Sequence, residues 1–232
     1  MRHASGPKIV TIDGPSGSGK STAARELAKR LGFLHLDTGA MYRAVALKAL
    51  RSGCPLSDAR QLGRLSRESV IAFRVDPGRK LRLLLDGEDV TRAIRRPAVT
   101  EAASRVAVVP AVRRALVRQQ QRIGRPGRVV AEGRDAGTVV FPSAPLKFFL
   151  STDPSQRARR RREELIAAGH RVGLKQVLTE IRRRDRRDRE RADSPLRVPK
   201  GAIRINNTHL KPAQTLDTML DYARHLFNNP RS

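Results

Sequence analysis

Short apolar runs alternate along the chain with longer segments in which apolar side chains recur every three or four positions. The short runs are typical of buried strands in a parallel sheet, and the longer segments are typical of the helices that cover it. This alternation predicts an α/β fold in which ligands bind at the carboxyl ends of the strands. The five predicted strands are Lys8–Asp13, Phe33–Asp37, Arg128–Glu132, Leu146–Leu150 and Ala202–Asn206.

The pattern changes at about residues 62–97, where short strands follow one another without intervening helices. Turn signals at Asp76–Gly78 and Asp86–Gly87 separate them. The segment is expected to be a small antiparallel lobe inserted into a single domain of 232 residues, whose core spans about residues 8–61 and 98–232. The three predicted strands of the lobe are Val70–Val75, Leu81–Leu85 and Glu88–Val90.

Helical periodicity resumes after the lobe. Ala98–Val109 and Ala111–Gln121 are predicted as two helices separated by Pro110. Gln156–Ala168 and Leu174–Arg191 are predicted as two further helices, and both are rich in arginine. An apolar stripe on the second of these favours a packed helix over a disordered basic arm, and its members are Leu174, Val177, Leu178 and Ile181.

A motif for binding phosphate follows the first predicted strand. Residues 14–22 match the pattern G-x-x-x-x-G-K-[ST], in which glycines let backbone N–H groups point inward to phosphate oxygens. In this pattern Lys20 reaches the β- and γ-phosphates, and the Ser21 hydroxyl is a ligand of Mg²⁺. The chain is therefore predicted to bind ATP through Gly14, Pro15, Ser16, Gly17, Ser18, Gly19, Lys20, Ser21 and Thr22.

Composition limits the class of protein further. Hydrophobic residues make up 39% and charged residues 30% of the chain, which is typical of a soluble globular protein. No apolar stretch approaches the roughly 20 residues that a membrane span needs. Cys54 is the single cysteine, so no intramolecular disulfide can form, which fits a cytoplasmic protein.

The net charge of +26 exceeds what the phosphates of two nucleotide substrates would require. Two interpretations account for the excess: an arginine-rich composition of the source genome, or attraction to a polyanion. Aromatic residues make up only 3% of the chain and tryptophan is absent, so few side chains could stack on bases. We expect nucleic acid to bind nonspecifically at most, and a polyanion-binding ATPase stays an alternative.

Several blocks of sequence together resemble the bacterial cytidylate kinases (CMP kinases), a family of P-loop nucleoside monophosphate kinases. The Glu132–Pro142 and Arg184–Leu196 blocks are the most specific. The blocks are Ile12–Ser21, Leu36–Arg43, Ala102–Ala107, Pro110–Arg113, Glu132–Pro142 and Arg184–Leu196.

The resemblance implies transfer of the γ-phosphoryl group of ATP to CMP or dCMP. It also implies that the inserted lobe binds the nucleoside monophosphate and that residues 157–191 form an arginine-rich lid. We expect a monomer, although the sequence alone does not fix the oligomeric state. A kinase of another small molecule, such as UMP, is the nearest alternative. The implied catalytic residues are Lys20, Arg157, Arg184 and Arg191. The implied substrate-binding residues are Thr38, Tyr42, Arg43, Ser104, Arg113, Arg134, Asp135, Asp188 and Arg191.

Individual roles also follow from the resemblance. The acceptor phosphate would be held by Arg43, Arg134 and Arg191, and the cytosine would be read by Ser104, Arg113 and Asp135. Asp188 would contact the sugar, and Thr38 and Tyr42 would line the pocket. The implied lid arginines are Arg157, Arg160, Arg161 and Arg184. Helical spacing places the first three on one helix face, and it does the same for Arg184, Asp188 and Arg191.

The chain departs from the family pattern near its last predicted strand. Val198–Ala202 lacks the acidic residue that usually precedes this strand, and Ile205–Thr208 replaces a run that often contains aspartate. Both departures fall near the side on which the resemblance places the adenine of ATP.

Overall fold

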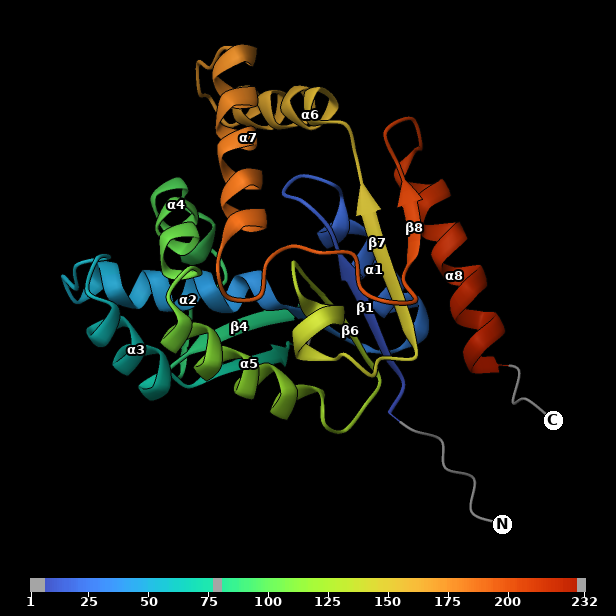
Figure 1. Ribbon diagram of the computed structural model, residues 1–232, viewed down its shortest axis with the longest axis horizontal. Coiled ribbons are helices and arrows are strands. Elements are labelled where there is room, and N and C mark those ends of the chain that lie inside the picture. Colours follow the sequence, from blue (N-terminus) through green and yellow to red (C-terminus); the bar gives the residue numbers. More distant parts are fainter. Residues whose placement is uncertain (1–6, 77–80, 229–232) are drawn as a thin grey trace. The chain divides into compact units, whose positions relative to one another are not determined.

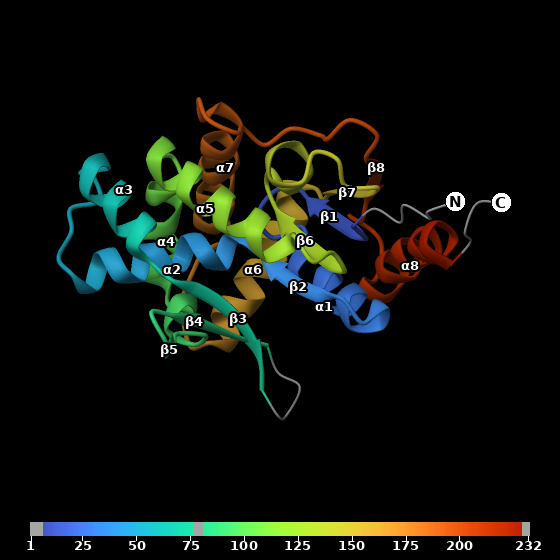
Figure 2. The same ribbon diagram turned by 90° about the horizontal axis from the view of Figure 1, so that it is seen from below.

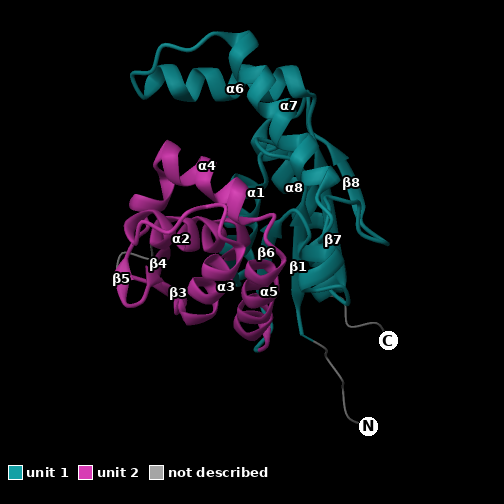
Figure 3. Cartoon of the chain, turned by 60° about the vertical axis from the view of Figure 1, so that its left-hand side comes forward, with its two compact units in different colours: residues 1–35, 126–232 teal, residues 36–125 magenta. Residues whose placement is uncertain are grey.

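The computed structural model describes residues 7–76 and 81–228, so most of the turn predicted at Asp76–Gly78 lies outside the described residues. The chain forms two compact units (Figure 3). The first contains residues 1–35 and 126–232, and the second contains residues 36–125. Within the described ranges, no helix is both long and apolar enough to cross a membrane.

A parallel sheet with the strand order β2-β6-β1-β7-β8 is the centre of the first unit (Figure 1). The sequence prediction of these strands is confirmed to within one residue at each end. β2 crosses the boundary between the two units, since that boundary falls after His35. The strands are β1 (Ile9–Asp13), β2 (Leu34–Asp37), β6 (Val129–Gly133), β7 (Leu146–Ser151) and β8 (Ile203–Asn206).

The central strand β1 is buried on both faces, which explains its continuous apolar run. Val10 and Ile12 belong to a core that also contains residues of α1 (Lys20–Leu31) and α8 (Pro212–Asn228). These two helices contact each other along that face (Figure 2). Thr11 and Asp13 alternate with the core residues, and a π-helical turn at Ala136–Val140 packs against β1.

Two basic helices follow β7 in the same unit. α6 (Pro154–Ala167) begins after Asp153, whose carboxylate accepts from two amides at the helix start. α7 (Leu174–Glu190) packs against α6 through Ala158, Val177 and Ile181. The predicted helix pair is confirmed, with bounds shifted by one or two residues.

The second unit combines four helices with a three-stranded antiparallel sheet (Figure 3). Within it, α2 packs on α4 and α3 packs on α5. The helices are α2 (Thr38–Arg51), α3 (Ala59–Glu68), α4 (Pro97–Val106) and α5 (Pro110–Gly124), with a 3₁₀ turn at Ala93–Arg95. The sheet contains β3 (Ile71–Val75), β4 (Leu81–Leu85) and β5 (Glu88–Asp89).

The antiparallel sheet predicted between residues 62 and 97 is confirmed, although Leu62 lies inside helix α3. Helix α4 ends at Val106, three residues before its predicted end. The cause is Pro110, which begins α5 and holds Val109 in an extended conformation, with φ −78° and ψ 115°.

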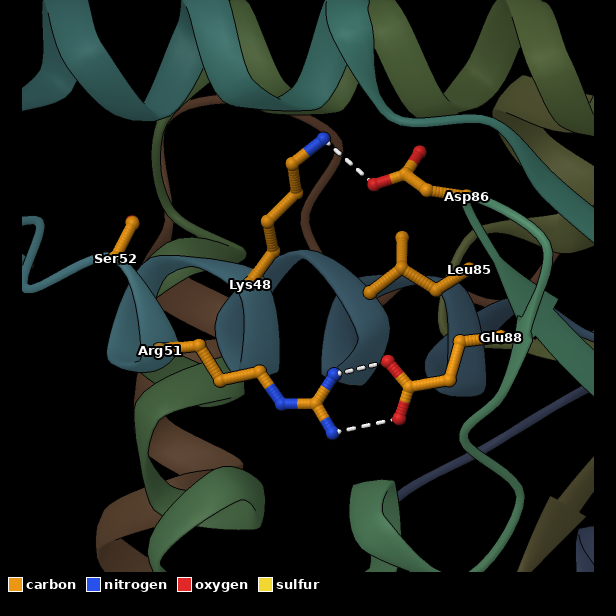
Figure 4. Close-up of a pocket in the computed structure, with 6 residues that line it drawn as sticks. All are labelled: Lys48, Arg51, Ser52, Leu85, Asp86 and Glu88. Carbon is orange, nitrogen blue, oxygen red and sulfur yellow. Dashed lines mark hydrogen bonds and ion pairs between the residues drawn. The ribbon is translucent and has the colours of Figure 1, made fainter.

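Two ion pairs fasten the antiparallel sheet to helix α2. Lys48 and Asp86 approach to 2.7 Å, and Arg51 and Glu88 form a bidentate pair at 2.6 and 2.9 Å. These residues, with Ser52 and Leu85, line a shallow pocket (Figure 4). The four charged side chains of the pocket neutralise one another in pairs. The single cysteine, Cys54, is buried just after α2.

Candidate active site

The phosphate loop connects β1 to α1, and two of its positions require glycine for steric reasons. Gly14 has φ 151°, and a Cβ atom added there would lie 2.2 Å from the backbone oxygen of Leu150. Gly19 has φ 84° and is the residue from which α1 begins. A side chain at either position would strain the backbone, so the close approach of loop and strand requires glycine.

Lys20 lies inside this loop and is 5% exposed. Its Nζ donates to the backbone oxygen of Pro15 at 2.6 Å and to Ser18 Oγ at 3.4 Å. Burial, followed by the positive charge of Arg134, lowers the pKa of Lys20 to about 7. A bound phosphate would favour the charged form of Lys20 and would therefore raise its pKa again.

Ser21 is joined to a carboxylate that sequence reasoning did not assign. Its Oγ donates to Glu132 Oε2 at 2.7 Å, and His35 Nε2 lies 2.9 Å from Glu132 Oε1. Glu132 is 3% exposed at the end of β6, the strand beside β1. In phosphate-loop proteins an acidic residue at a strand end helps to hold Mg²⁺. The position of Glu132 directly after an apolar run was therefore the sequence signal that could have identified it.

The donor set beside the loop fits Mg²⁺ in type and number. Mg²⁺ prefers oxygen ligands and is commonly bound by one or two carboxylates together with substrate phosphates and waters. Ser21 and Glu132 supply a hydroxyl and a carboxylate within hydrogen-bond distance of each other. Over the described ranges, no group of three or more His, Cys, Asp or Glu side chains could hold a metal ion.

Asp13, the last residue of β1, fixes the segment that follows β6. Its carboxylate accepts from the amides of Ala136 and Gly137 at 2.8 and 2.7 Å. Burial outweighs these hydrogen bonds and raises the pKa of Asp13 to about 6. Gly137 is required here because a Cβ atom would lie 2.6 Å from Thr11 Oγ1. The π-helical turn was not predicted from the sequence.

Arg134 and Asp188 form the first of two ion pairs between this segment and α7. Arg134 Nε donates to Asp188 Oδ2 at 2.7 Å. Burial alone would raise the pKa of Asp188, but the charge and hydrogen bond of Arg134 lower it below its usual value. Arg184, half-buried on the same helix, lowers it further.

Asp135 lies opposite Arg191, which follows α7. The Arg191 Nη2 and Asp135 Oδ1 atoms are 3.5 Å apart, and both side chains are nearly buried. Arg191 also donates from Nε to the backbone oxygen of Ser194 at 2.7 Å. The structure therefore brings Arg134, Asp135, Asp188 and Arg191 together, although they come from two separate sequence blocks.

The three arginines expected on one face of α6 have different surroundings. Arg157 is 1% exposed and is held by Asp185 and by backbone oxygens. Arg160 donates to the backbone oxygen of Asn207 at 3.5 Å. Arg161 is exposed and pairs with Glu164 at 2.9 Å.

The second unit holds the remaining predicted residues. Asp37 caps helix α2 by accepting from the amide of Ala40 at 2.8 Å, and its other oxygen accepts from Arg43 Nη2 at 2.8 Å. Thr38, the first residue of α2, is buried. Asp37 thus fixes both the start of the helix and the direction of Arg43.

Arg113 and Tyr42 are in contact within the second unit. The guanidinium carbon of Arg113 lies 5.4 Å from the centre of the Tyr42 ring, which is cation–π distance. Arg113 is 1% exposed and donates to the backbone oxygen of Ala107 at 3.1 Å. Ser104 is half-buried on α4, the neighbouring helix along the chain.

Fold and site together define a class. A parallel sheet with a glycine loop between β1 and α1, a buried loop lysine and a Ser–Glu pair at the adjoining strand end is the arrangement of a P-loop nucleotide-binding protein. The model of the cytidylate kinase family matches residues 10–225. The chain belongs to the cytidylate kinase family.

Curated relatives agree with this membership. The chain is 52% identical over 211 residues to a cytidylate kinase from Pelotomaculum thermopropionicum, covering 91% of this chain and 93% of that one. A cytidylate kinase from Caldanaerobacter subterraneus is 45% identical, with 93% and 94% covered. A solved structure from Eubacterium ventriosum, described as an uncharacterized protein, has a TM-score of 0.52 at 13% identity over 95% and 99% of the chains, which shows the shared fold.

Proposed function

We propose that this protein transfers the γ-phosphoryl group of ATP to CMP or dCMP, giving ADP and CDP or dCDP. The observation that carries the proposal is a phosphate loop in the same unit as two Arg–Asp pairs, Arg134–Asp188 and Arg191–Asp135. The family membership of the chain supports CMP as the acceptor.

The triphosphate is bound by Lys20 and by backbone N–H groups of the loop at residues 14 and 16–22. The transition state of phosphoryl transfer spreads negative charge over the equatorial oxygens, so catalysis depends on positioning and on positive charge. Lys20 and the lid arginines, among them Arg184, would stabilise that charge. Ser21 and Glu132 would hold Mg²⁺, which would neutralise part of the charge of the phosphates.

The acceptor phosphate is already anionic and requires no general base. Arg134 and Arg191 would hold it together with Arg43, each donating charge-assisted hydrogen bonds. Asp188, which orients Arg134, would reach a hydroxyl of the sugar. Water must be excluded during transfer, because ATP would otherwise be hydrolysed.

Base recognition would rest on complementary donors and acceptors. Asp135 would accept from the amino group of cytosine, and Arg113 would donate to its acceptor atoms, with Ser104 nearby. Thr38 and Tyr42 would line the pocket. Uracil presents an oxygen in place of the amino group, so UMP would leave Asp135 opposite a lone pair.

We further propose that the enzyme is a cytoplasmic monomer whose cofactor is Mg²⁺. The oxygen donors of Ser21 and Glu132 support the choice of metal. Nucleic acid is expected to bind nonspecifically at most, through the net charge of +26.

A coupled assay of ADP release tests the proposal. The protein is supplied with ATP and Mg²⁺ and with CMP, dCMP, UMP or AMP as acceptor. We expect rapid ADP release with CMP and dCMP and slow release with the others. ADP release that depends on polynucleotide but not on CMP would replace the proposal with a polyanion-binding ATPase.

A further inference from the structure

The outward-facing carbonyl groups of the phosphate loop are bonded to side chains. The amides of such a loop turn toward phosphate, so its carbonyl oxygens point the other way and need donors where water is excluded. Lys20 donates to the oxygen of Pro15. Arg157 Nη1 donates to the oxygen of Ser16 at 2.9 Å, and Asn207 Nδ2 donates to the oxygen of Ser18 at 2.9 Å.

Arg157 and Asn207 are also joined to each other through Thr152. The backbone oxygen of Thr152 accepts from Arg157 Nε at 3.1 Å, and the Thr152 hydroxyl donates to Asn207 Oδ1. Asp185 of α7 completes the set, since its two oxygens accept from Arg157 at 3.1 and 2.6 Å. We call this set the loop network, and its members are Thr152, Arg157, Asp185 and Asn207.

Burial makes the loop network sensitive to the loss of a member. Arg157, Asp185, Asn207 and Thr152 are 1%, 4%, 5% and 6% exposed. The Arg157 guanidinium therefore lies in a place where an unpaired charge is costly, and Asp185 neutralises it. Gly17 lies against Arg157, since a Cβ atom added at Gly17 would be 3.6 Å from the arginine Cβ.

Two features of the loop network are specific to this chain. Asn207 lies in the Ile205–Thr208 run that departs from the family pattern, and its amide supplies both a donor and an acceptor. Asp185 stands beside Arg184 on α7, so the helix that carries a proposed catalytic arginine is fastened to the loop that binds ATP.

We propose that the loop network holds the phosphate loop in its phosphate-binding conformation, with Asp185, Arg157 and Asn207 as positioning residues for the ATP phosphates. This inference rests on ATP binding by the loop and is independent of which acceptor the enzyme uses.

Binding of ADP to Asn207→Ala and Asp185→Asn tests the proposal by isothermal titration calorimetry. Asn207→Ala removes a donor to the loop, and Asp185→Asn removes the charge that pairs with Arg157, so we expect ADP to bind about tenfold more weakly. The CMP affinity of Asn207→Ala should stay within about twofold of wild type, because the Asn207 amide bonds to Ser18 and Thr152 and to no proposed CMP-binding residue. The amides of residues 14 and 16–19 of the nucleotide-free variants should exchange hydrogen faster than those of wild type.

Matched controls are available on the same elements. Asn206→Ala removes an exposed amide next to Asn207, and Glu190→Gln removes an exposed carboxylate of α7 that lies 4.0 Å from Arg186. Both controls should bind ADP as wild type does. Thr152→Val keeps the side-chain size and should weaken ADP binding about threefold. This milder variant still tests the proposal if the stronger variants fail to fold.

Folded Asn207→Ala and Asp185→Asn proteins that bind ADP as tightly as wild type would overturn the proposal. It would also be overturned if ADP and CMP affinities fell together in Thr152→Val, since that result describes general loss of structure. Failure of the acceptor assignment would leave these readouts unaffected, because ADP binding and amide exchange need no acceptor.

Discussion

Helix α7 presents two aspartates, three residues apart, to two arginines of different burial: Arg157 is buried and Arg134 is half-buried. Asp185 binds Arg157 through both oxygens, and that arginine also donates to two backbone oxygens. Asp188 binds Arg134 through a hydrogen bond from Nε at 2.7 Å. We call these the loop side and the substrate side of α7. Similar charge pairs can therefore serve fixed geometry in one place and ligand binding in another.

The largest expected effect comes from removing the charge of Lys20. Lys20→Ala should lower kcat by about a thousandfold or more, because Lys20 acts on the transferring group. The melting temperature should hold or rise, since a buried charge is lost. The control is Lys29→Ala, an exposed lysine of the same helix. Near-normal turnover by folded Lys20→Ala would contradict the phosphate-loop mechanism.

Paired substitutions on the two sides test the comparison directly. Arg134→Met should lower kcat/KM for CMP about a hundredfold, because a charged phosphate ligand is lost, while ADP affinity stays near wild type. Arg157→Met should instead weaken ADP binding and destabilise the fold by about 3 kcal/mol, because Asp185 is left buried and unpaired. Steady-state kinetics, ADP titration and urea unfolding separate the outcomes. If both variants change kcat/KM, ADP affinity and the free energy of unfolding in the same way, the two sides of α7 do not differ in function.

A smaller effect concerns base choice on the substrate side. Asp135→Asn replaces a pure acceptor with a group that can also donate toward the oxygen of uracil. We expect kcat/KM for CMP to fall about tenfold or more, with a smaller loss or a gain for UMP. Parallel assays with both nucleotides measure the ratio. An equal loss of kcat/KM for CMP and UMP would show that Asp135 does not distinguish the two bases.

A pH dependence of stability is expected at Asp13, which fixes the segment that follows β6. Its pKa is about 6 in the folded protein and 3.8 in its ordinary state, so the folded state binds the proton more tightly. Stability relative to Asp13→Asn should therefore fall by about 2 to 3 kcal/mol as the pH rises from 4 to 7. Urea unfolding of both proteins across this range measures the difference, and a pH-independent difference would contradict the raised pKa.

Local patterns predicted the elements and the loop well. Apolar runs identified all five strands of the parallel sheet, because a strand such as Ile9–Asp13 is buried on both faces. The fixed spacing of Gly14, Gly19, Lys20 and Ser21 identified the phosphate loop. Helical spacing also grouped Arg184, Asp188 and Arg191, two of which take part in the pairs between α7 and the segment after β6.

Contacts between distant residues could not be predicted in this way. Ser21 and Glu132 are 111 positions apart, and their hydrogen bond depends on β1 and β6 being neighbours in the sheet. The spacing of Arg157, Arg160 and Arg161 suggests one environment, but only Arg157 meets a carboxylate of α7 in the interior. The π-helical turn depends on Gly137 packing against Thr11, which no local pattern encodes.

The burial of Cys54 offers a built-in reporter of local unfolding in the second unit. The thiol is 5% exposed, and its amide donates to the oxygen of Ala49 at the end of α2. Burial raises the pKa of the Cys54 thiol, which further limits the reactive thiolate. Because the chain has one cysteine, its rate of modification by a thiol reagent would measure how often this segment opens, without any introduced label.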